Sequence, residues 1–337
     1  MWRGVIALLG DGFRAVTTSL LGYGDTDERR TPDDVSIERE IDVIEAVIQR
    51  TNSAVHLVGH SYGATVCLAT AFRDRTKIAS MTLIEATPFN LLRHSGDLGL
   101  YEQVRAMSDT YVRSCDNGNL LAARGIIDFY GGDGSFDTFG ARARDNIVAT
   151  TPTNILDWSS AWCFDVPLAA YAGITAPSLL VRGERSHPVV QRVAEVLNDA
   201  ISRSSLVTVP GASHFMISTH ASDLSRGSSV STSQRSRRRA SLASLDTCSP
   251  GVPVPVGRQG PVEGVKNWGD ARPHLVRKSG ARKSVVAVAG NAASCSTSAS
   301  SGRPLIRATP PSEGPRSSTS RLIVRPERST KILKSRD

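Results

Sequence analysis

Residues 55–65, VHLVGHSYGAT, constrain the fold of this 337-residue chain more than any other stretch. The run 55–59 is short and almost wholly apolar, which is typical of a strand buried on both faces of a parallel sheet. It leads into GHSYG at 59–63, and the small residues of 64–73 favour a helix. Glycines at both outer positions allow a turn too tight for a Cβ atom, with Ser61 in a strained conformation at its tip. The stretch therefore predicts a parallel α/β sheet that presents a serine hydroxyl at one edge.

Alternating strand and helix signals extend this interpretation over the first 225 residues. Further strands are expected at 13–21, 78–86, 178–183 and 205–212, and helices at 2–10, 37–50 and 189–201. Residues 88–170 differ, because they look helical and contain no clear strand. The pattern predicts a mostly parallel sheet flanked by helices, with residues 88–170 inserted as a helical lid.

Composition divides the chain near residue 225. Residues 226–337 hold 21 of the 40 Lys and Arg residues but 6 of the 32 Asp and Glu residues, so the excess of positive charge belongs to them. This part is rich in Ser, Arg, Pro and Gly and has too little apolar surface to offset the entropy of ordering. The sequence predicts an α/β domain at 1–224 and a disordered basic tail at 225–337.

Two functions of the tail stay open beside an inert one. Its clustered arginines favour salt-dependent binding to nucleic-acid phosphates. With Trp268 as its one aromatic residue, base stacking has little support, so we do not expect a nucleic-acid partner. The run Arg237–Ser241 is also typical of a basic kinase site in a regulated linker.

Cysteines and apolar runs exclude several classes of protein. The five cysteines are scattered and have no CxxC spacing, so neither a disulfide framework nor a zinc site is indicated. No apolar run approaches the roughly 20 residues of a membrane span. The N-terminal residues lack a convincing cleavage site for a signal peptide. We expect a cytoplasmic protein without a membrane or metal partner.

A serine nucleophile requires a neighbouring base that removes its proton. Among the seven histidines, His214 stands out because it follows an expected strand in the glycine-containing segment 209–216, VPGASHFM. The start of the helix after Ser61, with the backbone N–H of Tyr62, faces the position of a developing oxyanion. The alternatives are that His214 has only a structural role and that the turn at 59–63 has no catalytic role.

About the first 220 residues resemble the α/β-hydrolase superfamily. The resemblance rests on the serine turn at 59–63, on LLGYGDTD at 20–27, similar to the loop after the family's fourth strand, and on the histidine segment 209–216. It implies an α/β-hydrolase fold with Ser61 as nucleophile and His214 as general base. It implies no metal and no organic cofactor.

The acid that would orient His214 is absent from the position that the resemblance implies. The resemblance implies an acid three residues after Gly183, but that position is Ser186 and the neighbouring Glu184 is expected to face elsewhere. Some members of the superfamily place their acid at the end of the strand after the serine turn, where this chain has Glu85. Glu85 is therefore the candidate acid, and a glutamate that caps the entry to the lid is the alternative.

Serine at the nucleophile position also restricts the chemistry. Haloalkane dehalogenases and epoxide hydrolases of this superfamily use an aspartate there, whereas a serine favours acyl transfer to water from an ester, a thioester, a lactone or an activated carbon–carbon bond. The expected partner is a small acyl substrate, and the oligomeric state is not readable. Trp158, Trp162 and Phe164 are candidates for an apolar acyl or aryl pocket, with lid core as the alternative.

The resemblance also implies that something is missing. The family's third strand lies between the strands that match 13–20 and 54–60, and its following loop gives a second oxyanion N–H. Since this strand would precede the helix at 2–10, we expect the chain to be truncated at its N-terminus, without a central strand and one of two oxyanion donors. A non-catalytic or degenerate hydrolase fragment is therefore the alternative function.

Overall fold

The computed structural model describes residues 2–9, 13–226 and 283–289. The basic run Arg237–Ser241 and Trp268 lie outside these residues, as does nearly all of the expected tail. The predictions of a nucleic-acid arm, a kinase site and a disordered tail therefore fall outside the described part of the chain, except at residues 225–226 and 283–289.

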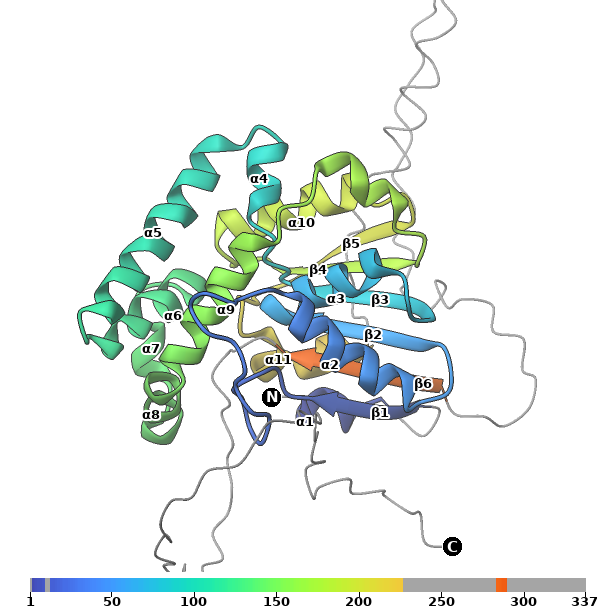
Figure 1. Ribbon diagram of the computed structural model, residues 1–337, viewed down its shortest axis with the longest axis horizontal. Helices are drawn as coiled ribbons and strands as arrows, with labels where there is room; N and C mark the ends of the chain where they lie inside the picture. The colour runs from blue at the N-terminus through green and yellow to red at the C-terminus, as the bar shows by residue number, and fades with distance from the viewer. Residues whose placement is uncertain (1, 10–12, 227–282, 290–337) are drawn as a thin grey trace, which may run out of the picture.

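Six strands form one sheet, and all of their pairings are parallel (Figure 1). The strands are β1 (Phe13–Thr18), β2 (Val55–His60), β3 (Ile78–Ile84), β4 (Ser178–Gly183), β5 (Ser204–Val209) and β6 (Lys283–Ala289). Their spatial order is β1-β6-β2-β3-β4-β5. The predicted fold class, a parallel sheet flanked by helices, is confirmed.

Strand β6 corrects two expectations. It lies between β1 and β2, the position expected to be empty, and it comes from the segment expected to be a disordered tail. The residues KSVVAVA explain this, because β-branched and small apolar side chains suit a strand covered on both faces. The average composition of a segment rich in Ser and Arg hides so short a run.

Helices cover both faces of the sheet. One face packs against α2 (Glu38–Gln49), α3 (Tyr62–Arg73) and α10 (Pro188–Ala200). The other packs against short helices near the two ends of the described domain, α1 (Arg3–Ile6), α11 (Met216–Thr219) and α12 (Ala221–Arg226). The apolar side chains of α2 recur at helical spacing and face the sheet, as the sequence predicts.

Between β3 and β4 the chain is helical, as expected for residues 88–170. This segment contains α4 (Asn90–His94), α5 (Leu98–Asp116), η1 (Leu120–Ala122), α6 (Ala123–Gly131), α7 (Ser135–Thr138), α8 (Ala141–Ala149), α9 (Thr151–Cys163) and η2 (Leu168–Gly173). Most of these helices gather beyond one end of the strands (Figure 1). Within the described ranges, no helix is both long and apolar enough to cross a membrane.

Strand β6 is buried from both sides. Val286 and Val288 belong to the core under α2 and α3 and have no exposed surface, whereas Ala287 belongs to the opposite core. Full burial of one valine side chain stabilises a fold by about 1.5–3 kcal/mol. The segment 283–289 therefore contributes to both cores of the domain.

We expect Val286→Ala to lower the free energy of unfolding by about 2 kcal/mol, because it removes buried methyl groups and leaves a cavity. Leu121→Ala is the control, since Leu121 is exposed and its loss should change stability by less than about 0.5 kcal/mol. Denaturant unfolding of the full chain measures both. Equal effects of the two substitutions would contradict the position of β6 in the core.

Candidate active site

The turn from β2 to α3 is as tight as the sequence predicts. A Cβ atom on Gly59 would lie 2.6 Å from both the Cα atom of Ala64 and the carbonyl oxygen of Gly63, so helix and strand approach closely because Gly59 has no side chain. Ser61 at the tip has φ 54° and ψ −128°, a strained conformation for a residue with a side chain. Its N–H donates to the carbonyl oxygen of Ile84 in β3 at 2.9 Å, which helps to hold the turn.

His214 meets the serine from the loop after β5. Its Nε2 atom lies 3.0 Å from the Oγ atom of Ser61, and its side chain is buried. The ring of Tyr130 from α6 stacks on the imidazole, with centroids 4.0 Å apart and planes 14° from parallel. The loop also runs close to β4, because a Cβ atom on Gly183 would lie 2.3 Å from the carbonyl oxygen of Ala212. These contacts fix the plane of the imidazole beside the hydroxyl.

Glu85 follows β3 and completes the row of polar groups. Its Oε2 atom lies 3.2 Å from the Nδ1 atom of His214. Its Oε1 atom accepts hydrogen bonds from the Gly183 N–H at 2.7 Å and from the Ser186 hydroxyl at 2.9 Å. Thus the serine at the position where the resemblance implies an acid donates to the glutamate from the neighbouring strand. Ser61, His214 and Glu85, singled out from the sequence, are brought together.

Burial sets the protonation of this row. It lowers the pKa of His214 to about 3, so the imidazole is neutral near pH 7. Burial raises the pKa of Glu85 to about 7, while the hydrogen bonds from Gly183 and Ser186 act in the opposite direction and favour the carboxylate. A neutral imidazole has one nitrogen that donates and one that accepts, as an orienting acid and a serine hydroxyl require.

His60 is a site residue that the sequence analysis missed. Its Nε2 atom lies 2.8 Å from the carbonyl oxygen of His214 and donates to it. The Nδ1 atom is buried and has no hydrogen-bond partner among the described residues. Burial lowers the pKa of His60 to about 3, with the charge of a protonated His214 acting in the same direction. The position of His60 inside the serine turn could have identified it from the sequence, because the turn places it directly before Ser61.

The N–H of Tyr62, the predicted oxyanion donor, lies at the start of α3. Tyr62 is the first residue of α3, so its N–H has no acceptor within the helix. The expected absence of a second donor is not tested by the described residues. Strand β6 ends beside this turn, with Ala289 opposite His60, and the residues that follow lie outside the described part.

A small cavity that is partly open to solvent lies beside Ser61. Its lining residues are Ser61, Tyr62, Thr87, Phe89, Ile126, Tyr130, Asn154, Asp157, Trp158 and Ala161. Helix α9 therefore contributes a polar part as well as the expected aromatic wall. Trp158 is the one of the three predicted pocket aromatics in this lining.

Trp162 and Phe164, the other two predicted pocket aromatics, are not in the lining of this cavity. Trp162 lies one turn beyond Trp158 on α9, and its indole N–H donates to the Ser108 hydroxyl of α5 at 2.9 Å. Phe164 follows the end of α9 and packs near Phe72 of α3, with ring centroids 6.1 Å apart. Trp162 lies on the same side of α9 as Trp158 but one turn further along the axis, where its ring packs against Tyr101 of α5 with centroids 5.9 Å apart.

Comparison with known proteins identifies the family. The model of the alpha/beta hydrolase family matches residues 1–225. The chain belongs to the alpha/beta hydrolase family.

The chain is similar, at low identity, to solved structures of hydrolases. An esterase, EaEST, from Exiguobacterium antarcticum is 16% identical, with a TM-score of 0.47 over 67% of this chain and 78% of that one. MenH from S. aureus is 15% identical, with a TM-score of 0.44 over 67% of this chain and 80% of its own. No curated protein matches the sequence.

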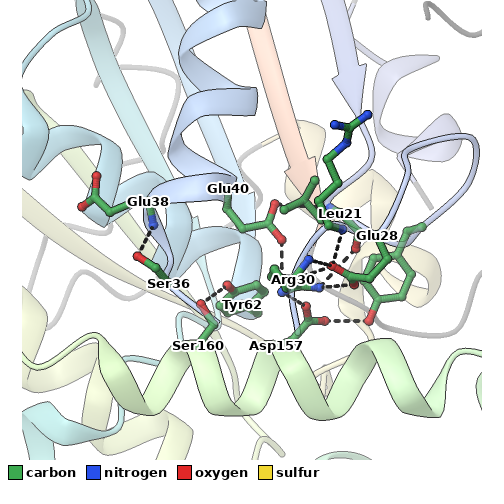
Figure 2. A network of polar contacts seen from close by, with 11 residues as sticks. Leu21, Glu28, Arg30, Ser36, Glu38, Glu40, Tyr62, Asp157 and Ser160 are labelled. Atoms are coloured by element: carbon green, nitrogen blue, oxygen red, sulfur yellow. Dashed lines mark hydrogen bonds and ion pairs between the residues drawn. The ribbon is translucent and has the colours of Figure 1, made fainter. Parts of the chain in front are cut away.

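A buried ionic network joins three parts of this hydrolase-family chain (Figure 2). The guanidinium of Arg30 has no exposed surface and contacts Glu28 at 2.8 Å, Asp157 of α9 at 2.8 Å and Glu40 of α2 at 3.3 Å. The hydroxyl of Tyr23 donates to Asp157 at 2.6 Å. Helix α9, which lines the cavity, is thereby attached to the loop after β1.

A second contact attaches α9 to the serine turn. The hydroxyl of Tyr62 donates to the Oγ atom of Ser160 at 2.7 Å (Figure 2). No sequence signal predicts these contacts, because Arg30 and Asp157 lie far apart along the chain and resemble ordinary surface charges. Among the described residues, no cluster of His, Cys, Asp and Glu has an arrangement suited to a metal ion.

The network makes stability depend on pH. Burial raises the pKa of Glu40 to about 8, assisted by the charge of Asp157, and burial raises the pKa of Asp157 to about 6. The folded chain therefore retains protons that the unfolded chain releases above its ordinary carboxyl pKa values. Their contribution to stability is complete below those values and is lost as the pH rises through the folded pKa values.

We expect the free energy of unfolding to fall between about pH 5 and pH 8, by at most about 1.4 kcal/mol per pH unit for each carboxyl. Glu40→Gln removes one titrating group at nearly constant shape, so its stability should fall less over this range. Glu102→Gln, at an exposed position, is the control and should leave the slope unchanged. Denaturant unfolding at several pH values measures the slopes, and equal slopes for all three proteins would contradict the raised pKa of Glu40.

Proposed function

We propose that this chain is a serine hydrolase that cleaves an ester or a related acyl bond of a small molecule. The observation that carries the proposal is the continuous row from the Ser61 hydroxyl through the His214 imidazole to the Glu85 carboxylate, with contacts of 3.0 and 3.2 Å. These are the distances at which a nucleophile, its general base and an orienting acid exchange or hold protons. Family membership supports the same class of reaction.

The first half of the reaction transfers the acyl group to the protein. The Ser61 hydroxyl gives its proton to Nε2 of His214 while Oγ bonds to the acyl carbon, and the former carbonyl oxygen becomes an oxyanion. The N–H of Tyr62 at the start of α3 stabilises that charge. The imidazolium then returns the proton to the leaving oxygen as its bond to the acyl carbon breaks.

The second half releases the acid. A water molecule gives a proton to Nε2 of His214 and attacks the acyl carbon, after which Oγ of Ser61 leaves and regains the proton. Glu85 holds Nδ1–H throughout, so Nε2 stays directed at Ser61 and the transient imidazolium is stabilised. No step requires a metal or an organic cofactor.

The helices beyond the sheet serve as a lid in this proposal. Trp158 and Phe89 give the cavity beside Ser61 an aromatic wall suited to an apolar acyl or aryl group, and their rings stack with centroids 5.7 Å apart. Asn154 and Asp157 make the other part polar. The preferred substrate is therefore an ester or related compound with an apolar acyl group of modest size.

Ser61→Ala should abolish covalent labelling by a fluorophosphonate and lower turnover of a short-chain p-nitrophenyl ester by at least about 10³-fold. Ser218→Ala, which removes an exposed hydroxyl, is the matched control and should behave as the unchanged protein. Mass spectrometry locates the label, and circular dichroism checks that each variant folds. A folded, unlabelled parent chain would favour the alternative of a non-catalytic hydrolase relative.

Glu85→Ala should lower kcat by about 10²–10⁴-fold, because His214 loses the group that fixes its tautomer. Ser186 contacts the carboxylate of Glu85, so an acid at position 186 can reach the same place. Adding Ser186→Asp to Glu85→Ala should therefore raise kcat at least tenfold above that of Glu85→Ala alone. Ser186→Asn in the same background matches the size without the charge and should restore none. Steady-state kinetics on the p-nitrophenyl ester distinguish the three, and full activity of Glu85→Ala would remove Glu85 from the mechanism.

A further inference from the structure

Strand β6 joins β1 to the rest of the sheet. Among the described residues, β1 pairs with β6 alone, in the register from Phe13 opposite Lys283 to Thr18 opposite Val288. The other edge of β6 pairs with β2, from Val55 opposite Ser284 to His60 opposite Ala289. Without the segment 283–289, β1 would lose its strand partner and β2 would present an unpaired edge beside the serine turn.

One path of contacts leads from β6 directly to the nucleophile. His60, opposite Ala289, immediately precedes Ser61. Val286 and Val288 pack in the core that also contains apolar residues of α3, the helix that begins after Ser61. The segment 283–289 therefore supports both the strand before the turn and the helix after it.

A second path leads from β6 to the cavity. Strand β1 continues into the loop that carries Tyr23 and Arg30. Both of these side chains donate hydrogen bonds to Asp157 of α9, and Figure 2 shows the contact from Arg30. Asp157 and Trp158 line the cavity beside Ser61. Loss of β6 would release β1 from the sheet and with it the anchor of the cavity wall.

Strand β6 is far in sequence from the other strands of the sheet. The described range that begins at residue 13 ends at Arg226 in α12, and β6 begins at Lys283, so residues 227–282 separate them in the sequence. The other five strands and the whole row from Ser61 to Glu85 lie before residue 227. The site is thus built from two pieces that are distant in sequence and held together by a parallel β ladder on each side of β6.

We propose that residues 283–289 act as an internal complementing strand, whose insertion between β1 and β2 assembles the active site of the proposed hydrolase. The occupant of the position is this chain's own segment, SVVAVA with its preceding lysine. The position selects an extended, parallel segment of small or β-branched residues, because both faces are covered and both edges are paired. Burial and pairing with β1 and β2 hold the segment 283–289 in the sheet. We therefore expect the segment to stay in place when the chain between residues 226 and 283 is cut.

The test uses the full chain with a site for a specific protease in place of residues 248–254. After cleavage of the folded protein, size-exclusion chromatography follows the C-terminal fragment and a fluorophosphonate reports on Ser61. We expect the fragment to co-elute with the body and labelling to stay within about twofold of the uncut protein. After unfolding in denaturant and dilution, recovery of labelling should depend on protein concentration for the cut protein and be independent of it for the uncut one.

Substitutions in the strand complete the test. Val288→Asp places a charge at a position without exposed surface, and in the cut protein it should release the fragment and reduce labelling at least tenfold. Lys283→Gln, at the partly exposed start of β6, is the control and should retain both fragment and labelling.

Two results would overturn the proposal. One is a fragment that separates from the body under native conditions while labelling persists, and the other is unchanged labelling and co-elution in Val288→Asp. The inference about the site rests on the proposed function, but different measurements would contradict each of them. An uncut chain that takes no label speaks against Ser61 as nucleophile, whereas co-elution of the fragment still reports whether β6 occupies its position.

Discussion

The close approach of α3 to β2 is the constraint on which the site depends. With no side chain at Gly59, the helix starts directly over the end of the strand, and Ser61 is forced to φ 54° at the turn. Such strain persists only where the surroundings over-determine it, and here strands pair with both edges of β2. The hydroxyl therefore stands at a fixed point at the carboxyl edge, where the loops after β3 and β5 bring Glu85 and His214.

The position of the acid follows from the same geometry. Glu85, at the end of the neighbouring strand, also has positive φ, 51°, and its carboxylate receives donors from Gly183 and Ser186 after β4. Burial alone would favour the neutral, protonated form of Glu85. The two donors offset part of the cost of burying the charged carboxylate. A buried carboxylate can orient an imidazole from either strand, provided that the other strand contributes hydrogen-bond donors in its place.

Much of this arrangement was predictable because its signals are local. The serine turn, the strands at 55–60 and 178–183 and the histidine loop each depend on a few neighbouring residues, and Glu85 directly follows the strand that pairs with the serine strand. Strand β6 was not predictable from the composition of its surroundings, since its five apolar residues are diluted in a long basic segment. The Arg30 network and the stacking of Tyr130 on His214 were hidden for another reason, because they join residues that only the tertiary fold brings together.

Strand β6 is an example of a strand that a parallel sheet accepts from a distant part of the chain. In an antiparallel hairpin the turn fixes which strands pair, whereas parallel neighbours always need a crossover, whose length changes the entropy of closure only slowly. What selects the occupant of the position between β1 and β2 is therefore side-chain chemistry on two faces and hydrogen bonding on two edges. Residues 283–289 satisfy both, with Val286 and Val288 in one core and Ala287 in the other. Because the same position supports the serine turn on one side and the anchor of α9 on the other, filling it couples the folding of the sheet to the geometry of the site.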